Sequence, residues 1–255
     1  MMIKKIFPNE LDLFNMSLER TVVPCSEEEV DYKCVVVDKP WGYEYLMFEN
    51  KDVAVWVLFL KHKAKTSTHC HPKKKTSLLV LGGEVETSSL DSLFMLKSMD
   101  GIIIERGVFH STKSVSTHGS FVMEIETPVK KSDLVRLKDE YGREALGYES
   151  GASISRNLEN YHYCDFHNEA EETEEVQKLI KDRVIRICNF TTLEQLQEKI
   201  SQEKGKIFCP LNYKLTNEEG QILLGIGEIA EAKDLLRSLK TDSIPKEGFI
   251  SLIVG

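Results

Sequence analysis

The feature that most constrains this chain is a pair of histidine-bearing segments joined by strand-forming sequence. His69 and His71 flank a single residue, and His110 follows in a later segment. Apolar runs and a Gly82-Gly83 turn lie between them, without the periodicity of a long helix. Residues two apart on a strand point to the same face, so His69 and His71 can present both imidazoles to one point. We therefore expect antiparallel strands that bring His110 to that point.

Three histidines with this spacing favour a metal site. A lone histidine on a strand is usually a half-buried side chain with satisfied hydrogen bonds, whereas His69, His71 and His110 together indicate a site that binds a metal, or descends from one that did. Three neutral imidazoles leave both positive charges of a divalent ion uncompensated. Such a site prefers anionic or bidentate oxygen ligands, and zinc, nickel, manganese and iron are the candidate metals.

Around these histidines the sequence resembles the cupin superfamily. The first cupin motif is Gly, five residues, His-x-His, three or four residues, Glu, six residues and Gly, of which the chain keeps His69, His71 and Gly82. Lys63 stands in place of the first Gly, and Lys75 or Thr76 in place of the Glu. The motif's usual carboxylate is therefore missing from this position.

The second cupin motif is Gly, five residues, Pro-x-Gly-x-x-His, three residues and Asn, of which the chain keeps Gly107 and His110. Met99, Glu105 and Ser114 replace the first Gly, the Pro and the Asn. The match covers about residues 35–130. The resemblance implies a mostly β fold, with an N-terminal barrel of the double-stranded β-helix or jelly-roll type.

The segment Lys39-Pro40-Trp41-Gly42 looks like the Arg/Lys-Pro-Trp-Gly segment of the type II phosphomannose isomerase-like cupins, which also occurs in bifunctional mannose-1-phosphate guanylyltransferases. A local explanation is compatible with it: proline fixes the start of a strand, glycine allows a tight bend, and Trp41 covers one barrel end. The resemblance implies a metal-dependent enzyme acting on a phosphorylated or nucleotide-linked sugar, with isomerase or epimerase chemistry.

Two further segments supply candidate catalytic residues. Of the three lysines at 73–75, we expect Lys75 in the site and the other two in a solvated turn. The strand pattern at 121–128 places Glu124 and Glu126 on one face. If that face looks into the barrel, either carboxylate could replace the missing ligand or act as a general base. If it looks outward, both are solvated, and the sequence leaves this choice open.

Candidate substrate-binding residues are Lys63 and Arg143, whose cationic side chains suit a sugar phosphate. Residues 132–148 combine a short helical pattern with a turn at Gly142, so Arg136 and Arg143 could instead be ordinary helix-surface charge. Two other functions also stay open. A three-histidine site is typical of non-haem iron dioxygenases, and the loss of motif residues would suit a sugar-binding module without turnover.

Composition excludes several classes of function. The chain has 255 residues, of which 41% are hydrophobic and 29% charged, as in a globular protein, and its net charge of -8 argues against nucleic-acid binding. Six scattered cysteines without a Cys-x-x-Cys pair, and no secretory signal, predict reduced thiols and a cytoplasmic location. No apolar run approaches the roughly 18 residues that a membrane span needs. The cupin resemblance also implies a homodimer.

The chain divides into four predicted parts. Residues 1–34 form an N-terminal arm with a short helix, residues 35–160 the barrel, residues 161–182 an acidic helix or linker, and residues 183–255 a small α/β domain. In the last part we expect a partly parallel sheet, a helix that begins with a capping box at 192–195, and a second helix at 228–239. Gly225-Ile226-Gly227 there predicts a tight turn, because too few glycines are present for a phosphate loop.

Overall fold

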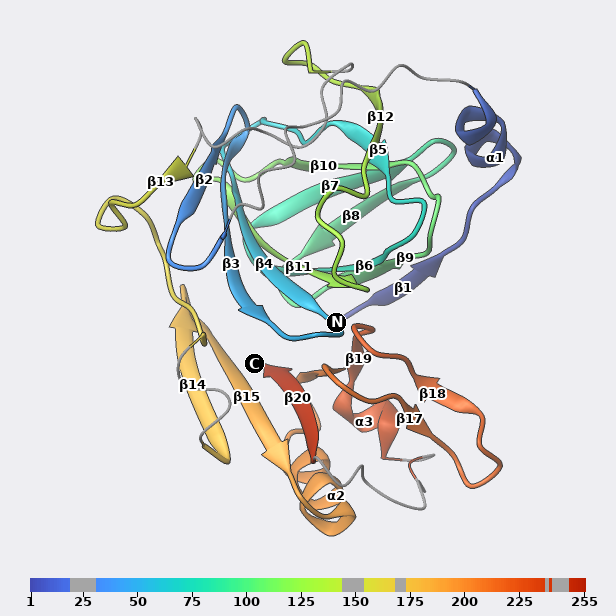
Figure 1. Ribbon diagram of the computed structural model, residues 1–255, viewed down its shortest axis with the longest axis vertical. Coiled ribbons are helices and arrows are strands. Elements are labelled where there is room, and N and C mark those ends of the chain that lie inside the picture. The colour runs from blue at the N-terminus through green and yellow to red at the C-terminus, as the bar shows by residue number, and fades with distance from the viewer. Residues whose placement is uncertain (19–30, 144–153, 168–172, 237–238, 240–247) are drawn as a thin grey trace.

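The computed structural model describes residues 1–18, 31–143, 154–167, 173–236, 239 and 248–255. Two β-sheets face each other in its larger part (Figure 1). The eight-stranded sheet has the order β1 (Ile3–Ile6), β9 (Gly101–Ile104), β6 (Lys75–Gly82), β11 (Ser120–Thr127), β4 (Ala54–Leu60), β3 (Gly42–Glu49), β2 (Val36–Lys39) and β13 (Ile154–Ser155). The five-stranded sheet has the order β12 (Val135–Lys138), β5 (Thr68–Cys70), β10 (His110–Ser114), β7 (Glu84–Ser89) and β8 (Leu93–Lys97).

This two-sheet barrel agrees with the mostly β prediction, with two corrections. The N-terminal arm is partly integral to the barrel, because β1 pairs in parallel with β9 at the sheet edge. Residues 135–138 form strand β12 rather than the start of a helix, since they pair with β5 and so satisfy their backbone groups in a sheet. Residues 144–153 of the expected helical stretch lie outside the described residues.

The eight-stranded sheet is buried on both faces. Alternation along β4 sends Trp56 and Leu58 into the barrel interior, where they pack with Val122 of β11. The opposite face carries Val57 and Met123, which pack against the C-terminal part of the chain. A strand between two cores needs apolar residues on both faces, which explains the unbroken apolar sequence of β4.

The C-terminal part contains a second five-stranded sheet, which packs on the outer face of the barrel (Figure 1). Its order is β14 (Glu175–Ile180), β15 (Arg183–Phe190), β20 (Phe249–Val254), β16 (Ile207–Pro210) and β19 (Ala230–Glu231). A small ribbon of β17 (Leu215–Thr216) and β18 (Ile222–Leu224) lies beside it. All of its neighbouring strands are antiparallel, so the prediction of a partly parallel sheet was wrong.

The acidic helix or linker predicted at 161–182 contains strand β14 instead. Val176, Lys178 and Ile180 are more buried than the residues between them, which is the period of two expected for a strand. A two-residue connection joins β14 to β15, and such short connections give antiparallel pairs because a parallel pair needs a crossover. The tight turn therefore makes this pair antiparallel, whereas the alternation of predicted helices and strands had suggested parallel pairs.

Three helices are described. Helix α1 (Glu10–Ser17) begins with a capping box between Asn9 and Asp12, and α2 (Leu193–Gln202) begins with the predicted box at Thr192. Helix α3 (Ala232–Leu235) is shorter than the predicted span of 228–239, part of which lies outside the described residues. None of the described helices has the length and apolarity to cross a bilayer.

The predicted tight turn at Gly225-Ile226-Gly227 is confirmed. Gly227 has φ +73°, its N–H donates to Pro210 O at 2.8 Å, and its carbonyl accepts from Ser77 Oγ of the barrel at 2.7 Å. The N–H of Gly225 donates to Glu228 Oε2 at 2.8 Å. The turn therefore joins the C-terminal part to the barrel, and its backbone groups are engaged within the protein.

Candidate metal centre

The structure brings the three histidines together at one end of the barrel interior. His110 lies directly opposite His69 where β10 pairs with β5, and His71 follows β5 on the same face. The ring centroids are 4.6 Å apart for His69 and His110, 5.0 Å for His69 and His71, and 5.6 Å for His71 and His110. One ring nitrogen of each lies within 4.8 Å of those of the other two.

Backbone carbonyls fix the orientation of all three rings. A carbonyl oxygen can only accept, so the ring nitrogen that bonds to it must carry hydrogen, and the other nitrogen then presents its lone pair. In each ring the bonded nitrogen is Nδ1, with Ser67 O at 2.8 Å from His69, Asp133 O at 2.5 Å from His71 and Val108 O at 3.0 Å from His110. The three Nε2 atoms are therefore the available ligands.

Burial keeps the three imidazoles neutral. It lowers the pKa of His110 to about 4, and it lowers those of His69 and His71 well below their usual value, with nearby cationic groups acting in the same direction. His71 Nε2 is buried without a hydrogen-bond partner in the described part of the chain. A buried acceptor without a partner is costly, and a metal ion would satisfy it. The donor set therefore fits a divalent metal.

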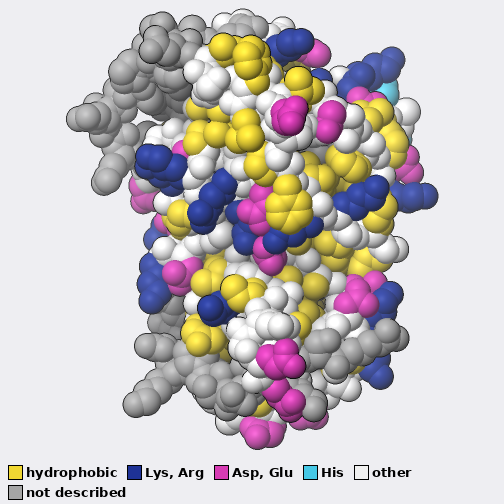
Figure 2. Space-filling view, turned by 90° about the vertical axis from the view of Figure 1, so that its right-hand side faces the viewer, with side chains coloured by type: hydrophobic (Ala, Val, Ile, Leu, Met, Phe, Trp, Pro, Cys, Tyr) yellow, Lys and Arg dark blue, Asp and Glu magenta, His cyan; other side chains and the backbone are white. Residues whose placement is uncertain are grey.

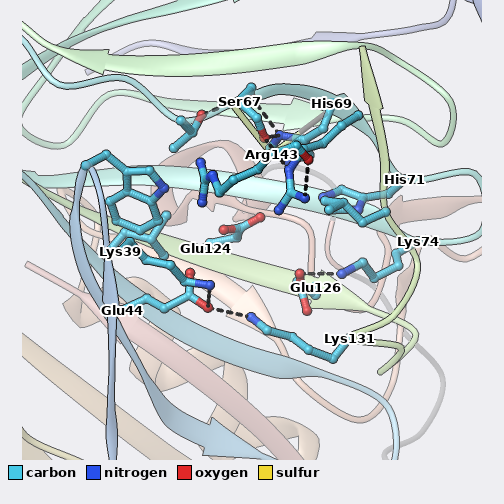
Figure 3. A pocket seen from close by; sticks show the side chains of 15 residues that line it. Lys39, Glu44, Ser67, His69, His71, Lys74, Glu124, Glu126, Lys131 and Arg143 are labelled. Atoms are coloured by element: carbon cyan, nitrogen blue, oxygen red, sulfur yellow. Dashed lines mark hydrogen bonds and ion pairs between the residues drawn. The ribbon is translucent and has the colours of Figure 1, made fainter. Parts of the chain in front are cut away.

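His69 and His71 line a cavity of about 60 Å³ whose walls are highly charged (Figure 3). Its lining includes five cationic residues, namely Lys39, Lys74, Lys131, Arg136 and Arg143. It also includes three acidic residues, namely Glu44, Glu124 and Glu126. Trp41, Leu58 and Leu134 supply its apolar surface. Charged groups of both signs are thus held together in a small, partly open cavity.

Glu124 and Glu126 both face the cavity, which settles the choice that the sequence left open (Figure 3). They share the inner face of β11 with Val122, whose side chain belongs to the interior core. Together with His71 they offer a second group of ligand atoms within 4.8 Å of one another. Burial, with the neighbouring Glu126 charge, raises the pKa of Glu124 to about 7. Glu124 can therefore accept or donate a proton near neutral pH.

Of the three lysines at 73–75, the one that lines the cavity is Lys74 rather than the predicted Lys75. Lys74 is 2% exposed, and its Nζ lies 2.5 Å from Glu126 Oε1. Lys75 points to the opposite face of β6 and pairs with Glu228 at 2.7 Å. Alignment to the cupin motif had suggested Lys75, but side chains alternate along a strand. Counting back in twos from the interior residue Leu78 would have selected Lys74.

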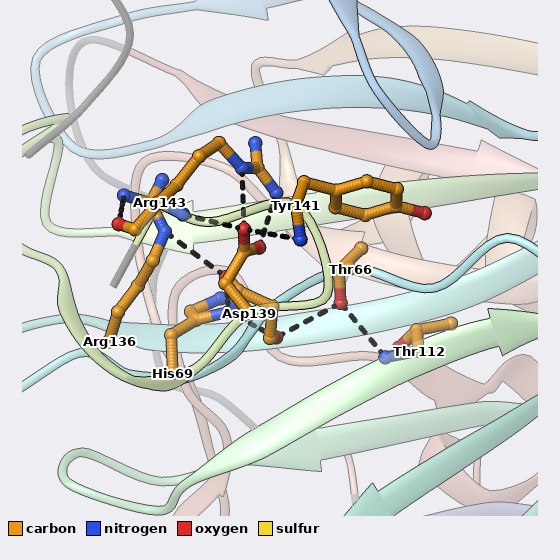
Figure 4. Close-up of polar contacts among 8 residues, drawn as sticks. Thr66, His69, Thr112, Arg136, Asp139, Tyr141 and Arg143 are labelled. Atoms are coloured by element: carbon orange, nitrogen blue, oxygen red, sulfur yellow. Dashed lines mark hydrogen bonds and ion pairs between the residues drawn. The ribbon is translucent and has the colours of Figure 1, made fainter. Parts of the chain in front are cut away.

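The two predicted substrate-binding residues have different locations. Lys63 is exposed in the turn after β4, with φ +63°, and does not line the cavity, so that prediction was wrong. Arg143 does line it, and its Nη2 and Nε bond to Asp139 at 2.7 and 3.1 Å (Figure 4). Arg136 lies beside it and donates from Nε to Ser67 Oγ at 3.3 Å.

Sequence reasoning missed three charged residues of the cavity. Glu44 Oε1 lies 3.6 Å from Lys39 Nζ and 2.9 Å from Lys131 Nζ. Lys131 also lies over the Trp56 ring, 3.2 Å from its centroid. Lys39 belongs to the segment that resembles the isomerase-like cupins, and Glu44 follows it on β3, so the resemblance could have indicated both. Lys131 comes from a loop, where the sequence has no periodicity from which the direction of its side chain could be predicted.

Comparisons with known proteins give no family assignment and only distant structural matches. No family model matches the chain, and no curated protein matches it. Among solved structures, KdgF from Halomonas sp. aligns over 41% of this chain and 93% of its own, with 15% identity and a TM-score of 0.36. An RmlC-like cupin from Shewanella frigidimarina covers 41% and 89%, with 15% identity and a TM-score of 0.35. CapF from Staphylococcus aureus covers 41% and 34%, with 15% identity and a TM-score of 0.38.

Similar structures also include a protein with a double-stranded β-helix domain from Klebsiella pneumoniae and a cupin-like protein from Thermotoga maritima. Their identities and TM-scores are low, so the description of this chain depends on its own strand order and register. Those define a two-sheet β-barrel with three convergent histidines at one end and a charged cavity beneath them.

Proposed function

We propose that this chain is a metal-dependent enzyme of the cupin type that acts on a phosphorylated or nucleotide-linked sugar. It would move a proton between neighbouring carbons, as an isomerase does, or return it to the other face of the same carbon, as an epimerase does. The observation that carries the proposal is the position of Glu124, whose pKa is about 7, beside three histidines with convergent Nε2 atoms. A general base with a pKa near neutrality is the group that such chemistry requires.

The residues have distinct roles in this proposal. His69, His71 and His110 would hold the divalent metal, which when bound supplies Lewis-acid polarisation of a substrate oxygen. Glu124 takes the proton from the carbon beside the carbonyl and returns it to the former carbonyl carbon, while the hydroxyl proton passes to the other oxygen. The change is internal to the sugar, so no external oxidant or reductant is needed. Lys74 pairs with Glu126 and holds it beside Glu124.

The charge of the cavity favours an anionic substrate. Its lining has five cationic and three acidic side chains, an excess of two positive charges before any metal is added. Arginine and lysine side chains bind phosphate and carboxylate oxygens.

Metal content and solvent isotope exchange test the proposal together. Protein purified without added metal is analysed for bound elements, then incubated with sugar phosphates in deuterated water. We expect zinc, nickel or manganese and deuterium at the exchanged carbon, and Glu124→Gln lowers the exchange about 10²- to 10⁴-fold because the base is lost. His110→Gln removes the metal, whereas His62→Gln, on an exposed histidine outside the cavity, retains it.

The remaining results identify other functions. Bound iron with oxygen uptake and no deuterium exchange would replace the proposal with a three-histidine dioxygenase, for which the all-imidazole donor set is suitable. Protein without metal that is still stabilised by a sugar would indicate a binding module.

A further inference from the structure

Helix α1 carries a buried carboxylate at a position that is normally exposed. Asp12 is 1% exposed, and it forms a capping box with Asn9. The Asn9 N–H donates to Asp12 Oδ2 at 3.0 Å, and the Asp12 N–H donates to Asn9 Oδ1 at 3.0 Å. A capping box needs only one carboxylate oxygen, so the cap explains Oδ2 but leaves Oδ1 for another role.

The second oxygen bonds to the segment that supplies a histidine of the candidate metal centre. Asp12 Oδ1 accepts from the N–H of Phe109 at 2.9 Å, across 97 residues of sequence. Phe109 is fully buried and directly precedes His110. A buried N–H needs an acceptor, and a carboxylate is a strong one because the hydrogen bond is charge-assisted.

The contacts around Phe109 connect this bond to the orientation of the His110 ring. The carbonyl that fixes the ring is that of Val108, on the other side of Phe109. The same loop is tied to the first histidine pair, because Gly107 N–H donates to His71 O at 2.9 Å. Helix α1 also packs on the loop through Met16, since a Cβ atom built on Gly107, which has φ +82°, would lie 2.8 Å from the Met16 sulfur.

We propose that Asp12 is a positioning residue for His110 and thereby raises the affinity of the centre for a divalent metal. This inference rests on the proposed function of the three histidines. Asp12 does not line the cavity and acts through Phe109, in the way that groups behind metal ligands orient them. The N-terminal helix is thus a part of the metal centre that sequence spacing alone does not reveal.

Two matched variants separate the bond to Phe109 from the helix cap. Asp12→Ala and Asn9→Ala each remove one side chain of the capping box, but only Asp12→Ala removes the bond to Phe109. Zinc affinity is measured by competition with a chromophoric chelator. We expect Asp12→Ala to weaken it about 10- to 100-fold, and Asn9→Ala to leave it within about threefold. Asp12→Asn keeps an oxygen for Phe109 and restores most of the affinity.

Hydrogen exchange in metal-free protein provides a second measurement. The Phe109 amide should exchange at least about tenfold faster in Asp12→Ala than in wild type or Asn9→Ala, because its acceptor is gone. Equal zinc affinity in wild type and Asp12→Ala, or an equal loss in Asn9→Ala, overturns the inference. A wild-type protein that binds none of zinc, nickel and manganese overturns the proposed function alone, and the exchange rates then decide whether Asp12 positions the loop.

Discussion

The two faces of the eight-stranded sheet have opposite characters although they are made by the same strands. On β11, Glu124 and Glu126 point into the charged cavity, whereas Met123 and Ile125 point outward into an apolar core shared with the C-terminal sheet. Successive residues of one strand therefore serve a site and a packing interface. Function and stability should consequently be separable by substitutions at neighbouring positions.

The lysines at the start of β6 show the same division. Lys74 is buried in the cavity with Glu126, and Lys75 lies on the outer face with Glu228. Glu228 also pairs with Lys5 at 2.7 Å, so it keeps a cationic partner if Lys75 is removed. Within the described part of the chain, Glu126 forms an ion pair with Lys74 alone.

The largest expected effect comes from comparing Lys74→Met with Lys75→Met. Lys74→Met leaves Glu126 buried without its ion-pair partner, which costs about 3–5 kcal/mol in the free energy of unfolding. Lys75→Met removes one of two partners of a more accessible pair and costs about 1 kcal/mol or less. Urea unfolding of both variants measures the difference. An equal decrease in the free energy of unfolding in both variants would show that the buried and the accessible ion pair contribute equally to stability.

A smaller effect is expected from Met123→Ala, beside Glu124 on the other face. Met123 is fully buried in the outer core, and truncating such a side chain costs about 2–5 kcal/mol through lost burial and a cavity. The metal content should not change, because the histidines lie on the inner side. Metal analysis and urea unfolding of the same preparation check both parts, and loss of metal from the folded variant would contradict the separation.

The part of the candidate site that lies on strands could be predicted from the sequence, because the period of two determines which face each side chain points to. His69 and His71 share a face because they are two apart, and His110 reaches them because short turns connect the intervening strands. The same period of two assigns Lys74 to the cavity, whereas alignment to the motif favours Lys75. Alternation along the strand fixes side-chain direction, so it outweighs a weak motif match.

Residues supplied by loops could not be found in this way. Lys131 and the Asp133 carbonyl come from the segment after β11, and their direction depends on tertiary contacts. Likewise, the antiparallel pairing of the C-terminal sheet was not predicted, because an acidic flanking sequence obscured strand β14. The helix cap at Thr192 was predictable because its hydrogen bonds are entirely local.

The smallest expected effect concerns Glu228 on the outer face, whose contribution to the free energy of unfolding should depend on pH. Burial alone would raise its pKa, but the ammonium groups of Lys5 and Lys75 outweigh burial and hold the pKa at about 2. Figure 2 shows acidic and basic side chains beside one another near the middle of the face that it draws. A carboxylate whose folded-state pKa lies below its unfolded value of 4.5 stabilises the protein above pH 4.5. That stabilisation is lost as the pH falls from 4.5 towards 2.

Comparing wild type with Glu228→Gln isolates this contribution, because the variant cannot titrate there. We expect the stability advantage of wild type to shrink by about 1–2 kcal/mol between pH 6 and pH 3, after allowance for solvent screening at the partly exposed Lys5. Urea unfolding at both pH values measures the change.

Glu124 on the inner face has the opposite effect on stability. Its pKa of about 7 lies above the unfolded value of 4.5, so its ionisation above pH 4.5 lowers the free energy of unfolding. If the difference in unfolding free energy between wild type and Glu228→Gln does not change with pH, then Lys5 and Lys75 do not stabilise the charged form of Glu228 in solution.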